Sequence, residues 1–85
     1  MIKLKNLKID EQENIICDAY PESAKEPGKI VVSKEEMIDF SLPQGYEWCE
    51  YHIRHAERYI IDNYNDLISK IRNNEIKTGL LIMWC

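Results

Sequence analysis

The sequence changes its hydrophobic period at Tyr46, and this change limits the folds open to it. Before Pro43 the apolar residues alternate or form short β-branched runs, whereas from Tyr46 to Asn73 they recur every three or four residues. The first pattern predicts strands and the second an amphipathic helix. Strands that precede a helix, without alternating with it, are typical of an α+β domain. We therefore predict an antiparallel meander sheet of four or five strands with one long amphipathic helix packed on one face, in the order β-β-β-β-α-β.

The expected strands cover about residues 2–9, 15–20, 29–33, 37–42 and 78–85. The first two are expected to form a hairpin, and the slip in alternation at Lys5 and Asn6 predicts a β-bulge. Residues Ser33 to Glu36 match the capping box of a helix start. The apolar residues that follow lack helical spacing, so we predict a strand there instead.

Length and composition favour one globular domain over residues 1–85. Of the 85 residues, 45% are hydrophobic and 31% are charged, which is too apolar for a disordered segment. No apolar run reaches the roughly 20 residues that a transmembrane helix needs. The first five residues alternate, unlike the apolar block of a signal peptide. We expect a cytoplasmic protein without a membrane partner.

Cysteine and codon usage point to the same compartment. The three cysteines, Cys17, Cys49 and Cys85, are odd in number and widely spaced. They predict free thiols in a reducing cytoplasm rather than a disulfide framework. Isoleucine, lysine and asparagine make up 27 of the 85 residues. Their codons are AT-rich, which indicates a low-GC genome, bacterial or from a phage.

The charge does not favour nucleic acid as a partner. Lysine and arginine number 11 against 15 aspartates and glutamates, so the net charge is −4, and no dense basic block stands out. Lys3, Lys5 and Lys8 gather on the first strand. We interpret them as charges that protect an edge strand from unwanted pairing. The alternative is an accessory nucleic-acid-binding protein that uses this basic N-terminal strand.

Two geometric observations predict a homodimer. A straight helix from Tyr46 to Asn73 would be about 42 Å long, whereas a compact chain of this length is roughly 31 Å across. The helix must therefore break near Asn63–Asp66, or its end must be covered by another chain. The closing strand is apolar on both sides, and one helix covers only one sheet face. The alternative is a central closing strand covered by the chain's own hairpin loop or by Phe40.

Four side chains of the helix form a candidate interaction surface. An advance of 100° per residue brings them within about 60° of one another at the border of the apolar stripe. They are Trp48, His52, His55 and Tyr59. Aromatic residues dominate binding hot spots, although the same residues also suit a packing seam. Met83 and Trp84 on the closing strand extend this candidate surface.

A metal or catalytic site is not expected. Cys49, His52 and His55 have zinc-ligand chemistry, but steps of three on a helix rotate by 60°, so the first and last lie about 120° apart. Cys49 also belongs to the apolar stripe, where a thiol is inert. Pairs of carboxylates and isolated glycines form no acid–base or phosphate-binding motif. We expect no cofactor, no metal ligand and no catalytic residue.

These observations together predict a non-catalytic protein-interaction module that self-associates as a homodimer. Two alternatives remain open from the sequence. One is the nucleic-acid-binding protein described above, and the other is a small-ligand or metal pocket near His52 and His55.

Overall fold

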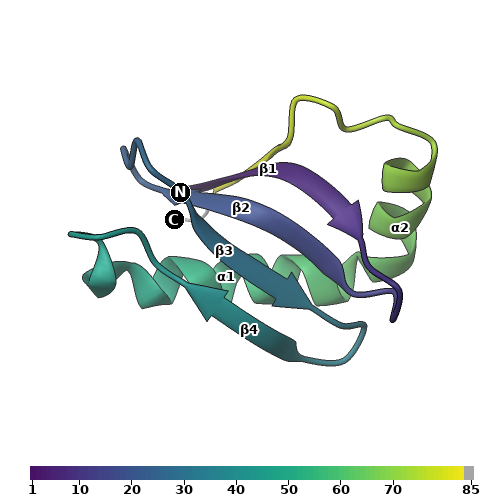
Figure 1. Ribbon diagram of the computed structural model, residues 1–85, viewed down its shortest axis with the longest axis horizontal. Helices are drawn as coiled ribbons and strands as arrows, with labels where there is room; N and C mark the ends of the chain where they lie inside the picture. The colour runs from purple at the N-terminus through teal and green to yellow at the C-terminus, as the bar shows by residue number, and fades with distance from the viewer. Residues whose placement is uncertain (84–85) are drawn as a thin grey trace.

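Five antiparallel strands form one sheet in a computed structural model, which describes residues 1–83. The strands are β1 (Ile2–Ile9), β2 (Ile15–Pro21), β3 (Gly28–Val32), β4 (Met37–Ser41) and β5 (Leu80–Ile82). A 3₁₀ turn, η1 (Glu47–Cys49), leads into the helices α1 (Glu50–Asp62) and α2 (Tyr64–Arg72). The order across the sheet is β4-β3-β2-β1-β5, and the helices lie against one face (Figure 1). The predicted α+β meander with a helical layer on one face is confirmed.

Local hydrogen bonds set the β1–β2 hairpin. The carboxylate of Asp10 accepts hydrogen bonds from the backbone N–H groups of Gln12 and Asn14, at 2.9 and 2.8 Å. Donors at a carboxylate favour its charged form, and the Asn14 backbone N–H does most to hold the pKa of Asp10 below its usual value. The register shifts between Lys5 and Lys8, where Asn6 has a φ of 56°. The predicted hairpin and bulge are confirmed.

The β3–β4 turn uses the residues that resembled a helix start. The hydroxyl of Ser33 accepts hydrogen bonds from the backbone N–H groups of Glu35 and Glu36, at 3.2 and 3.0 Å. Serine satisfies the same donors at a helix N-terminus. Because the following residues lack a helical apolar stripe, the chain extends into β4 as predicted.

The helical segment breaks at Asn63. This residue has a φ of −118°, and its side-chain amide donates to the Tyr59 carbonyl oxygen at 2.9 Å. The longest dimension of the protein is 33 Å, so a straight helix of about 42 Å would have projected from it. Figure 1 shows α2 turning away from α1 at the far end of the sheet. The break is one of the two predicted solutions, and with it the helix length no longer argues for a partner.

The turn between β1 and β2 holds α2 in place. The Tyr64 hydroxyl donates to the backbone oxygen of Glu13 at 2.5 Å, and the Arg72 guanidinium lies 2.6 Å from the Glu13 carboxylate. Glu13 has a φ of 63°. The second helix is therefore fixed to the first hairpin at the end of the sheet where α1 stops.

The core lies between the helices and one face of the sheet. Its side chains alternate along the strands and repeat every three or four residues along the helices, as each period requires. The largest that are fully buried are Ile2, Leu4, Ile15, Ile30, Ile53, Ile60 and Leu67. Each such side chain stabilises the fold by about 1.5–3 kcal/mol relative to exposure.

The closing strand β5 lies at the edge of the sheet, next to β1. Gly79, directly before β5, has a φ of +94°, and a Cβ at this position would lie 2.2 Å from the Leu4 carbonyl oxygen. Leu80 is partly buried and Ile82 is buried, whereas Leu81 and Met83 are exposed. The alternative of a central closing strand is wrong, because β5 has a neighbour on one side only within residues 1–83.

The interpretation of the lysines as edge protection is also wrong. β1 lies between β2 and β5, so its backbone groups are paired on both sides. Lys3, Lys5 and Lys8 project from the face opposite the helices, because Ile2 and Leu4 occupy the buried face. They form a cationic row on the face of the sheet and do not protect an edge strand.

Replacing Ile30 with alanine should lower the free energy of unfolding by about 2–5 kcal/mol, because its side chain is fully buried and leaves a cavity. Ile38→Ala is the matched control, since Ile38 is 53% exposed and should change stability by less than about 0.5 kcal/mol. Urea unfolding followed by circular dichroism measures both. Equal losses for the two variants would contradict the assignment of the core face.

Candidate interaction surface

The predicted surface residues lie on the side of α1 that faces β5. Arg54 marks the opposite side, because its guanidinium carbon lies 5.2 Å from the ring centroid of Phe40 in β4. At 100° per residue, Trp48, His55 and Tyr59 point away from that side. Since α1 also contacts β5, the helix border and the edge strand form one continuous surface.

The structure separates the predicted residues by exposure. Trp48 is 67% exposed, Tyr59 37% and Met83 71%, whereas His52 is only 7% exposed. His55 is half-buried. Trp84 lies outside the described residues. Three of the predicted side chains are therefore accessible to a partner, and His52 belongs to the interior.

His52 pairs with Glu22, which comes directly after β2. Its Nε2 lies 2.6 Å from Oε1 of Glu22, and the same carboxylate oxygen lies 3.7 Å from the Met1 ammonium group. The hydrogen bond with His52 is the largest cause that holds the pKa of Glu22 below its usual value. Glu22 has a φ of 52°, a left-handed conformation that is uncommon outside glycine. Sequence reasoning missed this pair, since a single acid 30 residues away carries no pattern.

Aromatic rings continue from this pair along the start of the helical segment. Tyr46 stacks on Trp48 with centroids 6.2 Å apart, and Trp48 meets the His52 ring edge-on at 6.0 Å. Tyr51 packs edge-on against His55 at 4.5 Å. Such pairs orient rings beyond what apolar burial achieves. Tyr51 is 65% exposed and was not among the predicted residues, although its aromatic type was a usable signal.

Most of the large exposed apolar side chains occupy one end of the molecule. Figure 1 shows the start of β1, the end of β5 and the start of the helical segment at this same end. Its members, which we call the apolar end, are Met1, Trp48, Tyr51, Leu81 and Met83. Met1 and Leu81 line a hollow on the sheet face opposite the helices, so the apolar end extends around the end of the sheet; large exposed apolar side chains at one end of a protein are typical of interaction sites.

Neither described cysteine has the character of a nucleophile. Cys49 is fully buried, and burial followed by the charge of Glu22 raises its pKa. Burial raises the pKa of Cys17 to about 12. The thiolate is the reactive form, so both side chains act as small apolar residues. Within residues 1–83, no three His, Cys, Asp or Glu side chains come together as a metal-binding group.

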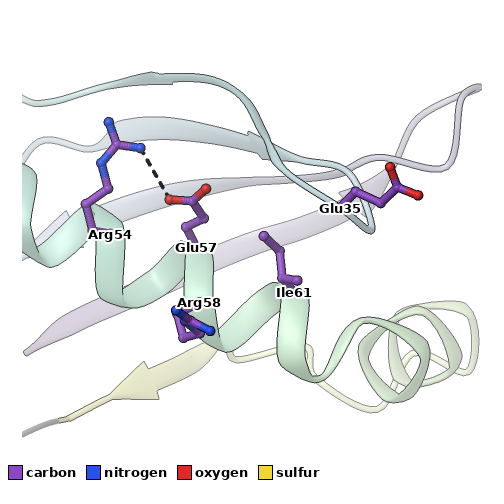
Figure 2. Close-up of a pocket in the computed structure, with 5 residues that line it drawn as sticks. All are labelled: Glu35, Arg54, Glu57, Arg58 and Ile61. Atoms are coloured by element: carbon purple, nitrogen blue, oxygen red, sulfur yellow. Dashed lines mark hydrogen bonds and ion pairs between the residues drawn. The ribbon is translucent and has the colours of Figure 1, made fainter.

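A hollow of about 400 Å³ lies between α1 and the β3–β4 turn. Figure 2 shows Arg54 and Glu57 directed toward each other, and Glu35, Arg58 and Ile61 complete the lining. Arg54 lies 3.3 Å from both Glu50 and Glu57, and its hydrogen bond with Glu57 does most to raise its pKa. Arg54 and Glu57 at this hollow are thus paired with each other, which favours a solvated ion-pair surface over proton transfer.

Within the described part of the chain, none of the helices has both the length and the apolar character to cross a membrane. Comparison with protein-family models, with curated proteins and with solved structures found no match to this chain.

Cysteine accessibility tests the interior placement. In a Cys85→Ser variant, which leaves Cys17 and Cys49, a thiol-specific reagent should label no cysteine in the native state and both after denaturation, because burial blocks access and raises both pKa values. Absorbance of the released chromophore counts the thiols. Rapid labelling of either thiol in the native protein would contradict the interior placement of these cysteines.

The pair between Glu22 and His52 predicts a pH dependence. The native pKa of Glu22 is lowered, so its carboxylate stabilises the fold above the ordinary glutamate pKa, and this contribution is lost as pH falls through the native value. Glu22→Gln should therefore be less stable than the parent near neutral pH, with a difference that shrinks in acid. Urea midpoints from about pH 7 to about pH 3 measure it. Glu26→Gln, in the same loop, removes the same charge without touching His52 and is the matched control.

Proposed function

We propose that the protein is a small cytoplasmic interaction module that acts by binding rather than by catalysis, and that its partner is a second copy of the chain. The observation that carries the proposal is the uncharged free edge of β5 beside the apolar end. An edge strand offers unpaired backbone N–H and C=O groups, which a further strand can use.

The two edges of the sheet differ in how readily each could pair with a further strand. At the β4 edge the register shifts between Val31 and Val32, which leaves Ile38 in a bulge, and Asp39 adds an exposed charge. Bulges and charges both discourage pairing with another strand. Residues 78–83 at the β5 edge contain no charge and no proline, and the β1–β5 register runs without a shift. The β5 edge is thus the one suited to association.

A second copy fits this edge because an antiparallel pair of identical strands is symmetric. Pairing centred on Leu81 sets Leu80 against the partner's Ile82 and Met83 against the partner's Gly79. The glycine has no side chain, which leaves space for the long methionine. The net charge of −4 opposes association in general, but repulsion between charges away from the interface is screened at physiological salt.

The helix border enlarges this interface. Trp48 of η1 and Tyr59 of α1 lie on the side of the helical segment that faces β5, and both are exposed. Tryptophan and tyrosine are enriched among the residues that dominate binding energy. In the proposed dimer they flank the paired strands, where they add apolar contact that three-residue strands alone lack.

Leu81→Glu tests the proposal without removing a core residue. Within one chain the new carboxylate faces Lys3 across the β1–β5 pair, which keeps β5 attached. In the dimer two carboxylates face each other at the symmetry axis. Sedimentation at tens of micromolar should give about twice the 10.1 kDa chain mass for the parent and the single mass for the variant.

Ile38→Glu is the matched control, because Ile38 and Leu81 are each 53% exposed and lie on opposite edges. It should leave the dimer intact. A parent protein that stays monomeric, or equal loss of association in both variants, would refute pairing at β5. Trp48→Ala with Tyr59→Ala tests the helix border separately, and an unchanged mass with an unchanged fold would remove that border from the interface.

A further inference from the structure

The sheet face opposite the helices carries no covering layer within residues 1–83, and we call it the open face. The register places its side chains in rows across the strands. One row joins Lys3 to Tyr20, a second joins Lys5, Asp18 and Lys29, and a third joins Lys8 to Ile16. In Figure 1 the helices lie on the other side of the sheet. The open face thus carries a row of lysines along β1, with Ile16 and the exposed Leu81 as apolar neighbours.

Charge is segregated between the two faces. The chain has eight lysines and three arginines, and all the arginines lie on α1 and α2. Five lysines lie on or beside the open face, namely Lys3, Lys5, Lys8, Lys25 and Lys29. The register adds two aspartates, Asp18 and Asp39, of which Asp18 accepts a hydrogen bond from Asn6 at 2.8 Å. Glu22 at the larger hollow brings the acids to three against the five lysines, so a chain with an overall negative charge has one surface with a net positive charge, which complements a polyanion.

Two hollows follow one another along β1 on this face. The larger, of about 390 Å³, is lined by Lys3, Lys5 and Lys25 together with Tyr20 and Leu81, and the carboxylate of Glu22 lies at its end beside Met1. The smaller, of about 240 Å³, includes Lys8 and Lys29. A small phosphate ester would occupy one hollow and leave the other lysines without an anion. The spread of amines over both hollows favours a polymer.

Tyr20 adds an aromatic ring to the cationic surface formed by the lysines. Its ring is half-buried in the larger hollow, and the Lys5 ammonium lies 5.4 Å from its centroid. Surfaces that bind single strands without sequence preference combine a cationic track for the backbone with an aromatic ring on which a base stacks. An acidic peptide would use the lysines but has no base to stack on the ring.

We propose that the open face binds single-stranded nucleic acid, with its phosphates along Lys3, Lys5, Lys8 and Lys29 and one base on Tyr20. One chain supplies every residue, so binding does not depend on the proposed dimer. Base edges are not read by these lysines, so binding is independent of sequence.

The experiment follows the fluorescence anisotropy of a labelled twelve-residue oligothymidylate titrated with the full chain. If three to four phosphates are neutralised, affinity should fall about 20- to 50-fold between about 50 and 200 mM salt. Replacing Lys3, Lys5 and Lys8 together with glutamine should remove most of this salt dependence and weaken binding at low salt. Tyr20→Ala should weaken binding at least about fivefold, whereas Tyr20→Phe should retain it.

The control replaces Lys34, Lys70 and Lys77, which lie away from the open face, with glutamine. It makes the same change in net charge and should bind like the parent. Three results would overturn the proposal: no binding at low salt by a folded protein, an equal loss in the control triple variant, or unchanged binding by Tyr20→Ala together with equal affinity for polyglutamate. The last result would assign the face to an acidic protein instead.

Discussion

Burial on one side of the sheet is the constraint from which the rest of this structure follows. Ile53, Ala56 and Ile60 of α1 are fully buried in the core that also contains Leu4 and Ile30 of the sheet. A chain of 85 residues supplies one helical layer, and that layer covers one face. The strands can therefore alternate cleanly, with apolar side chains inward and lysines outward. The break at Asn63 serves the same burial, because it keeps the apolar side chains of both helices packed against the sheet.

Sequence reasoning succeeded where the cause is local. The alternation in Ile2 and Leu4, the slip at Asn6 and the helical repeat from Tyr46 each depend on neighbouring residues, and each is found in the structure. The break at Asn63 was one of two predicted solutions, since weak helix formers follow there. It could be chosen only once the size of the whole sheet was known.

The candidate site was less predictable because its contacts join distant segments. The helical repeat identified Trp48 and Tyr59, and their exposure agrees with a position at the border of the stripe. It could not reveal that Glu22 would meet His52 or that β5 would pair with β1 at the sheet edge. The lysines of β1 were interpreted as edge protection for the same reason, because the sequence does not show that β5 covers that edge. The sequence gives the chemical type of each residue, but the neighbours of that residue across a sheet depend on strand order.

The pairing of β5 with β1 has a kinetic consequence. Every other pair of strands joins elements adjacent along the chain, whereas this one joins Ile2 with Ile82 across nearly its whole length. Forming this pair closes the longest loop in the sheet and so costs the most conformational entropy. Only the three residue pairs of the β1–β5 register offset that cost. We therefore expect β5 to attach late as the chain folds and to detach by local opening before the other strands do. Each opening bares the backbone of β1, so two molecules can exchange their final strands without unfolding the meander.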